Sequence, residues 1–280
     1  MIEITIPAEE ELRQQLIALL GQLGVEGFWE DGELLKCYVP DQKWSPALQE
    51  EMRSVIGMIV SPSAHPLPPM HVQALADRNW NADWEKTIQP IHVTPHIVIT
   101  PSWHVYAAAP GELVLTIDPK MSFGTGYHES TRLILGLVER AVRPGMSVID
   151  IGTGTGVLAI AAIRLGARDA VACDIDEWSY DNAIENATMN GVSDRITVLQ
   201  GDITVTPDRT YDLVIANIQR NVLISLLPAM RTKLAPGGTM LLAGLLNIDR
   251  EAMTDALQEH GLRVTEECAE NEWIALAARV

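Results

Sequence analysis

Hydrophobic and polar residues alternate with two different periods over the first 60 positions of the chain. Isoleucines at positions 2, 4 and 6 predict a strand over 2–6, and leucines at helical spacing predict a helix over 12–23. Two further apolar segments, 25–29 and 34–39, flank the dipeptide Asp31-Gly32, which favours a tight turn. We therefore expect a strand, a helix and a β-hairpin in this order.

A second helix is predicted to begin at Ser45 and Pro46, because serine is a favoured N-cap residue and proline is tolerated at the first helical position. The helix is expected to end near residue 56, and the apolar segment 57–60 is expected to form the last strand of this region. This order of strands and helices predicts a small α+β domain of the ferredoxin-like type.

Prolines punctuate the chain beyond residue 61. They stand at positions 62, 66, 68 and 69 and do not favour regular structure there. We place a domain boundary at this point, with a first domain at 1–62, a linker at 63–90 and a second domain at 91–280. A connecting helix over 72–87, which carries Trp80 and Trp84, is expected within the linker.

Apolar strands alternate with amphipathic helices in the second domain. Three short strands are predicted first, at 91–93, 97–100 and 113–117. Seven more follow, at 148–151, 170–174, 196–199, 213–217, 239–243, 263–267 and 273–278. Helices between most of these strands predict a Rossmann-like α/β domain with a mostly parallel seven-stranded sheet. Only a short turn separates the last two strands, so the last strand is expected to be antiparallel.

The composition is that of a folded and acidic protein, with 47% hydrophobic residues and a formal net charge of −17. Such a charge opposes binding to nucleic acid and attracts a basic protein partner. The three cysteines are widely scattered, so neither a disulfide framework nor a metal site is indicated. No apolar run reaches the roughly 18 residues that span a membrane, and the N-terminus lacks a signal peptide pattern. We expect a soluble, cytoplasmic protein without a membrane partner.

A glycine-rich turn follows the first strand of the seven-stranded sheet. It reads Asp150-Ile151-Gly152-Thr153-Gly154-Thr155-Gly156. Glycines at Gly152 and Gly154 let the backbone approach a ligand, and the helix that follows presents free N–H groups to an anion. The dinucleotide fingerprint requires a further glycine where this chain has Val157, which disfavours a nicotinamide cofactor. The pattern D-x-G-x-G-x-G instead resembles motif I of class I methyltransferases.

Three polar residues follow the next strands of the same sheet. Asp174 ends the second strand at the spacing where a carboxylate accepts both hydroxyls of a ribose, while Asp176 is better placed to cap the following helix. Asp202, in a Gly-Asp pair after the third strand, resembles the methyltransferase motif near the adenine. Asn217 ends the fourth strand, where amino-methyltransferases often place Asn or Asp. No Pro-Pro-aromatic sequence follows Asn217, which disfavours a nucleobase or a glutamine as the target.

The segment before the glycine turn completes a specific resemblance. Residues 118–131 read Asp-Pro-Lys-Met-Ser-Phe-Gly-Thr-Gly-Tyr-His-Glu-Ser-Thr, and residues 234–238 read Leu-Ala-Pro-Gly-Gly, which is expected to be a turn. Together with the glycine turn, Asp174 and Asn217, these segments resemble the PrmA family, the methyltransferases of large-subunit ribosomal protein L-eleven. The resemblance covers nearly the whole chain. It implies a small N-terminal domain that recognises the substrate and a C-terminal catalytic domain.

The resemblance also implies which residues contact the cofactor, S-adenosylmethionine (SAM). Matching the motifs assigns cofactor contacts to Thr131, Gly152, Asp174 and Asn217, and assigns Phe123 and Gly124 to a loop over the cofactor. Asp150, Gly154 and Asp202 belong to the same motifs, and Asn217 is also the candidate catalytic residue. Tyr127, Glu129 and Ser130 differ from the residues common in the family, whereas His128 and Thr131 keep their places.

The activity implied by the resemblance is methyl transfer to lysine side chains and to the N-terminal amine of a basic ribosomal protein. We expect the enzyme to act as a monomer, with the amine aligned by Asn217 and neighbouring carbonyls. His128 is an open candidate for a proton acceptor. The alternatives are a methyltransferase of another protein or of a small-molecule amine, a nucleotide-binding module without catalysis, and an oxidoreductase.

Overall fold

The computed structural model describes residues 1–8, 10–25, 27–32, 34–60, 70–74, 88–120 and 122–280. The chain divides into two compact units, Met1–Asp83 and Trp84–Val280. Within the described residues, no helix is long and apolar enough to cross a membrane.

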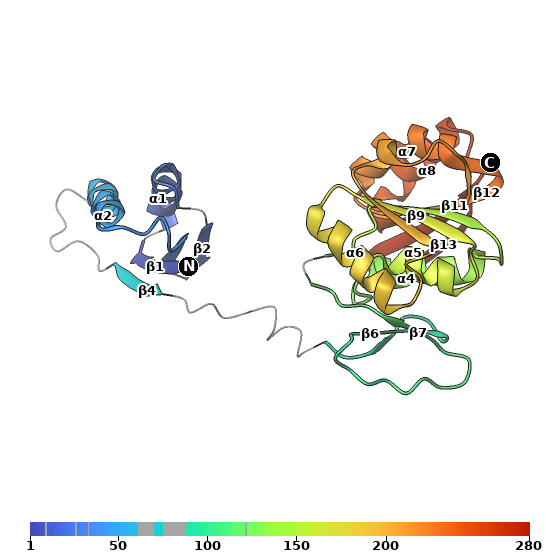
Figure 1. The fold of residues 1–280 in the computed structure, drawn as a ribbon. Helices are drawn as coiled ribbons and strands as arrows, with labels where there is room; N and C mark the ends of the chain where they lie inside the picture. The colour runs from blue at the N-terminus through green and yellow to red at the C-terminus, as the bar shows by residue number, and fades with distance from the viewer. Residues whose placement is uncertain (9, 26, 33, 61–69, 75–87, 121) are drawn as a thin grey trace. The chain divides into compact units, whose positions relative to one another are not determined.

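The first unit has the element order that is typical of ferredoxin-like domains. The elements are β1 (Ile2–Pro7), α1 (Glu10–Gln22), β2 (Gly27–Asp31), β3 (Leu34–Val39), α2 (Pro46–Val60) and β4 (His71–Ala74) (Figure 1). The strands form an antiparallel sheet in the order β2-β3-β1-β4. Alternate residues of β1 and β3, such as Ile4 and Cys37, are buried in one cluster with Leu16 and Leu20 of α1 and Met52 of α2.

The expected strand at 57–60 is wrong, because these residues form the last turn of α2. Leu48, Met52 and Ile56 are buried at intervals of four residues, and Ile59 packs against the same cluster. The apolar face of the helix therefore continues through a segment whose composition alone suits a strand. The fourth strand of the sheet is β4, which pairs with β1.

The predicted connecting helix at 72–87 is not found where the chain is described. Residues 72–74 belong to β4, and the rest of the predicted helix, with Trp80 and Trp84, lies outside the described residues.

The second unit contains two sheets. The smaller sheet joins β5 (Ile91–His92), β6 (Ile97–Thr100) and β7 (Leu113–Thr116). The larger sheet joins β8 (Ser147–Ile151), β9 (Asp169–Asp174), β10 (Ile196–Gln200), β11 (Tyr211–Asn217), β12 (Leu234–Leu246), β13 (Arg263–Glu270) and β14 (Trp273–Arg279). Its order is β10-β9-β8-β11-β12-β14-β13, and β14 is antiparallel to both of its neighbours. The predicted parallel sheet with an antiparallel last strand is confirmed. Residues 234–238, expected to be a turn, form the start of β12.

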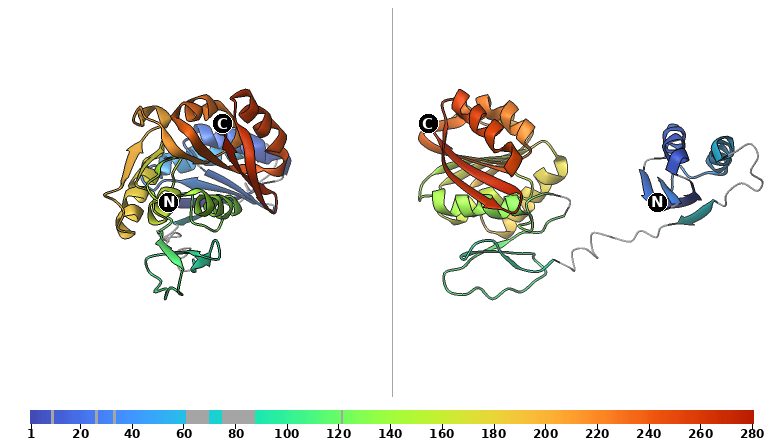
Figure 2. Two further views of the ribbon diagram at one scale, coloured as in Figure 1. Left: turned by 90° about the vertical axis from the view of Figure 1, so that its right-hand side faces the viewer. Right: turned by 180° about the vertical axis from the view of Figure 1, so that it is seen from behind.

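Helices cover both faces of the large sheet (Figures 1 and 2). One face packs on α4 (Glu129–Ala141), α5 (Val157–Arg164) and α6 (Glu177–Met189), and the other on α7 (Arg220–Lys233) and α8 (Arg250–Glu259). Neighbouring residues of a strand point to opposite faces of the sheet, as Val148 and Ile149 of β8 do. Because both faces are buried, the central strands are apolar throughout. The polar residues that end them lie together at one edge.

Candidate functional site

The glycine turn after β8 is held by its own side chains and cannot accept larger residues. Asp150 is fully buried and accepts a hydrogen bond of 2.6 Å from the hydroxyl of Thr153. Gly154 has a φ of +56°, and a Cβ atom there would lie 2.2 Å from the carbonyl oxygen of Phe123. Glycine is therefore required at Gly154 by its backbone conformation and by the close approach of a second segment.

Asp174, at the end of the neighbouring strand β9, accepts a hydrogen bond from this turn. One carboxylate oxygen accepts a hydrogen bond from the Gly154 N–H at 2.9 Å, and the other accepts one from the Asp176 N–H at 3.1 Å. A carboxylate oxygen accepts more than one hydrogen bond, so both keep capacity for a ligand. The cap of α6 is Asp176, as predicted, because its side chain accepts a hydrogen bond from the Ser179 N–H.

The loop before α4 is joined to the glycine turn through a single residue. The Thr155 N–H donates to the carbonyl of Phe123 at 2.9 Å, and the Thr155 hydroxyl donates to the carbonyl of Gly124 at 2.8 Å. Phe123 itself keeps 52% of its surface exposed. Thr155 thus fixes the loop backbone while the Phe123 ring remains available to a ligand.

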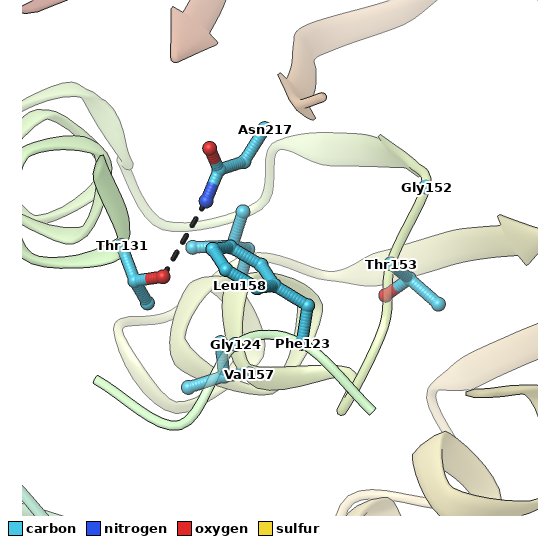
Figure 3. Close-up of a pocket in the computed structure, with 8 residues that line it drawn as sticks. All are labelled: Phe123, Gly124, Thr131, Gly152, Thr153, Val157, Leu158 and Asn217. Carbon is cyan, nitrogen blue, oxygen red and sulfur yellow. Dashed lines mark hydrogen bonds between the residues drawn. The ribbon is translucent and has the colours of Figure 1, made fainter. Parts of the chain in front are cut away.

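Asn217 ends β11 and meets Thr131 of α4. Its amide nitrogen donates to the Thr131 hydroxyl at 3.4 Å (Figure 3), and only 9% of its surface is exposed. The amide oxygen of Asn217 is buried and has no hydrogen-bond partner among the described residues. Such an orphan acceptor costs roughly 1–3 kcal/mol, so its presence in a pocket is informative about function.

These residues surround one cavity of about 790 Å³, a volume typical of small-molecule sites. Of the residues singled out in the sequence, the cavity is lined by Phe123, Gly152, Gly154, Asp174, Asp202 and Asn217. A second, smaller pocket shares Phe123, Gly152 and Asn217 and adds Gly124 and Thr131. Asp150 lies buried beneath the turn. The structure therefore gathers the predicted residues at the carboxyl ends of β8, β9, β10 and β11, where α/β proteins bind ligands.

Asp202 and His128 have structural partners of their own. The Asp202 carboxylate accepts hydrogen bonds from the N–H and hydroxyl of Thr204, and these bonds lower the pKa of Asp202. His128 is the N-cap of α4, because its Nδ1 accepts a hydrogen bond from the Ser130 N–H at 3.2 Å. When Nδ1 is an acceptor, the neutral ring carries its proton on Nε2. His128 is thus poorly suited to take a proton from a substrate.

Several residues that line the cavity were not predicted from the sequence. They are Ser130, Ile151, Cys173, Ile175, Asp176, Ser179, Gly201, Ile218, Gln219, Val222, Leu226, Gly244 and Trp273, and His128 was left open. Ile175 and Ile218 directly follow the predicted residues Asp174 and Asn217, so their positions after these strand ends could have indicated that they line the cavity. Trp273 was not predictable in this way, because it begins β14 and meets the His128 ring at a centroid distance of 4.4 Å.

Comparison with known proteins identifies the chain's relatives. The model of the family described as "Ribosomal protein L11 methyltransferase (PrmA)" matches residues 2–280. The chain belongs to this family. A ribosomal protein L11 methyltransferase of Chlorobaculum tepidum is 37% identical over 278 residues, which cover 98% of this chain and 94% of that protein. One of Pelotomaculum thermopropionicum is 37% identical over 88% of this chain and 79% of that protein.

A solved structure supports the same family membership. The ribosomal protein L11 methylase of Lactobacillus delbrueckii subsp. bulgaricus matches with a TM-score of 0.65 and 31% identity, over 69% of this chain and 98% of that chain. As a member of the PrmA family, the protein is a SAM-dependent methyltransferase. These similarities support neither an oxidoreductase nor a binding module without catalysis.

Proposed function

We propose that this PrmA family member methylates lysine side chains and the N-terminal amine of ribosomal protein L11. The observation that carries the proposal is the amide oxygen of Asn217, a buried acceptor for which the described chain offers no donor. An amine is a donor of suitable chemistry. An N–H of the amine would satisfy this oxygen and leave the nitrogen lone pair free for the methyl group.

The residues of the site fit SAM, which supplies an activated methyl group on a sulfonium. Gly152 and Gly154 line the cavity that would hold the cofactor, and Asp174 has the acceptor capacity that two ribose hydroxyls need. Phe123 and Gly124 would cover the cofactor, and Thr131 would hold Asn217 in place. The sequence motifs predict these contacts with the cofactor, except that they assign Thr131 to the cofactor itself.

The wall of the cavity suits a neutral amine better than an ammonium ion. Ile218, Val222, Leu226 and Trp273 line it, and an apolar wall disfavours the charged form of an amine. A lysine, whose ordinary pKa is about 10.4, must lose its proton before it attacks. The site would then need to orient the amine and exclude water rather than supply a strong base.

The remaining parts of the proposal concern the substrate protein. The net charge of −17 would attract a basic ribosomal protein. We assign the recognition of this substrate to the first domain, and we expect the enzyme to act in the cytoplasm, as a monomer and without contacting nucleic acid.

The test is transfer of labelled methyl groups to purified L11, followed by mass mapping of the product. Asp174→Asn should weaken SAM binding by about 100-fold, because it removes a charged acceptor worth about 3 kcal/mol. The matched control is Asp169→Asn at the opposite end of β9, where Asp169 pairs with Arg168 and Arg209. This control should lose stability and keep its affinity for SAM. Labelling of another protein but not of L11 would refute the proposed substrate, and equal SAM affinities would refute the role of Asp174.

A further inference from the structure

Three asparagines recur at every fourth position along α6, and the last of them is its C-cap residue. Asn182, Asn186 and Asn190 lie on one face of the helix, and all three are buried. Buried amides are costly unless they are hydrogen-bonded, so this face requires partners. The partners are backbone groups at the end of the small sheet and beyond it.

The side-chain amides of Asn190 and Asn186 form hydrogen bonds with the backbone of β7 and of the residues that follow it. The pattern is the one that a neighbouring strand would make. The Thr116 N–H donates to Asn190 Oδ1 at 3.0 Å, and Asn190 Nδ2 donates to the Thr116 carbonyl at 2.6 Å. Two residues on, the Asp118 N–H donates to Asn186 Oδ1 at 3.0 Å, and Asn186 Nδ2 donates to the Asp118 carbonyl at 3.3 Å. The two amides therefore satisfy the free edge of β7.

Asn186, unlike Asn190, also contacts the glycine turn. Its Nδ2 donates to the carbonyl of Thr155 at 2.9 Å. Thr155 in turn holds the carbonyls of Phe123 and Gly124. One side chain thus connects the beginning of the 118–124 loop to the residue that fixes its end, and these hydrogen bonds close a ring together with the chain that links Asp118 to Phe123.

The geometry points to Asn186 as a positioning residue for the cofactor site. Its amide links Asp118, whose carbonyl also accepts a hydrogen bond from Asn182 Nδ2 at 3.1 Å, to Thr155, and it thereby holds Phe123 and Gly124 against the glycine turn. Asn186 does not line either pocket of the described chain, so it acts through Thr155 and not by contact with a ligand. The inference rests on the proposed function only in that SAM is the ligand of the cavity.

The chain offers a matched pair of variants for the test. Asn186→Ala and Asn190→Ala each remove a buried amide that holds one residue of the same backbone edge, and both should lower the melting temperature. Only Asn186→Ala should weaken SAM binding, by about tenfold in calorimetry, whereas Asn190→Ala should stay within about twofold. Equal changes in both variants, or no change in either, would overturn the inference.

Hydrogen exchange gives a second measurement that needs no ligand. The Thr155 N–H, which donates to Phe123, should exchange faster in Asn186→Ala than in Asn190→Ala. This result would support the positioning role even if the wild type bound no SAM, an outcome that would refute the proposed function alone. If Asn186→Ala does not fold, Thr155→Val opens the ring at Gly124 and should weaken SAM binding to a similar extent. Unchanged SAM affinity in a folded Thr155→Val would overturn the inference.

Discussion

The amide nitrogen of Asn217 donates a hydrogen bond of 3.4 Å to the hydroxyl of Thr131, and this contact sets the orientation of the Asn217 amide oxygen. Its oxygen is buried and finds no donor in the part of the chain that the structure describes. The folded protein therefore bears a desolvation cost that a ligand N–H can relieve. A site of this kind gives up stability in favour of function.

Asn217→Ala should separate these two properties. Methyl transfer should fall by about 100-fold, because the acceptor for the amine is lost, a change of about 3 kcal/mol. The melting temperature should not fall, because an unpaired buried acceptor is removed together with a long hydrogen bond. Activity assays and thermal unfolding check both. Asn221→Ala, on the exposed first turn of α7, should change neither quantity. A destabilised variant with unchanged transfer would contradict this account.

Gly154→Ala and Gly191→Ala test the glycine turn with backbone strain held constant. The two glycines have φ values of +56° and +65°, so alanine is similarly strained at each. A Cβ atom at Gly191 meets nothing within 4 Å in the described structure, whereas at Gly154 it would lie 2.2 Å from the Phe123 carbonyl oxygen. Both variants should lose about 1 kcal/mol of stability from backbone strain, Gly154→Ala should lose more because of this clash, and only Gly154→Ala should lose SAM binding in calorimetry. Similar SAM affinities would show that the loop and the turn separate easily.

The second unit was predictable from the sequence because its central strands are buried on both faces. A strand such as β8 is then a short apolar run between polar segments, and its end is marked by the glycine turn. The elements of the first unit were harder to predict. Residues 57–60 include Ile59 and Val60, and β-branched residues favour a strand. The segment is helical because α2 packs on its sheet, which the local sequence does not reveal.

The site was predictable where function sits directly at strand ends, as for Asp174 and Asn217. Trp273 and Asn186 were not, for two different reasons. Trp273 reaches His128 only through the pairing of the last strands, which no local pattern reveals. Asn186 belongs to a regular polar face of a helix, and such a face normally lies in solvent. The fourfold spacing of asparagines was visible, but its buried partners were not.

His128 tests whether the enzyme uses a side-chain base. His128→Asn keeps a favoured N-cap residue at the start of α4, whereas His128→Ala should lower the free energy of unfolding by about 1 kcal/mol. Because Nδ1 of His128 serves as the cap, the rising limb of the pH–rate profile should follow the amine and keep its position in His128→Asn. Loss of an ionisation from that limb in His128→Asn would instead assign the proton transfer to His128.

Asp150 should make the stability of the second unit depend on pH. Burial raises the pKa of Asp150 to about 7, against the opposing effect of the hydrogen bond from Thr153. In the unfolded chain the carboxyl titrates near 3.9. Between these values the native state holds a proton that the unfolded state releases. The contribution of Asp150 to stability is therefore present at low pH, declines as the pH rises from about 4 to 7, and is lost above that.

Asp150→Asn isolates this contribution, because its neutral amide has the shape of the protonated acid. The quantity to measure is the free energy of unfolding of the wild type minus that of the variant, from urea titrations between pH 5 and pH 8. All other titrating groups cancel in this difference. It should fall by about 3 kcal/mol, which corresponds to about two pH units at 1.36 kcal/mol each. A difference that stays flat or rises with pH would mean that Asp150 is ionised throughout, and that the glycine turn is built around a buried charge.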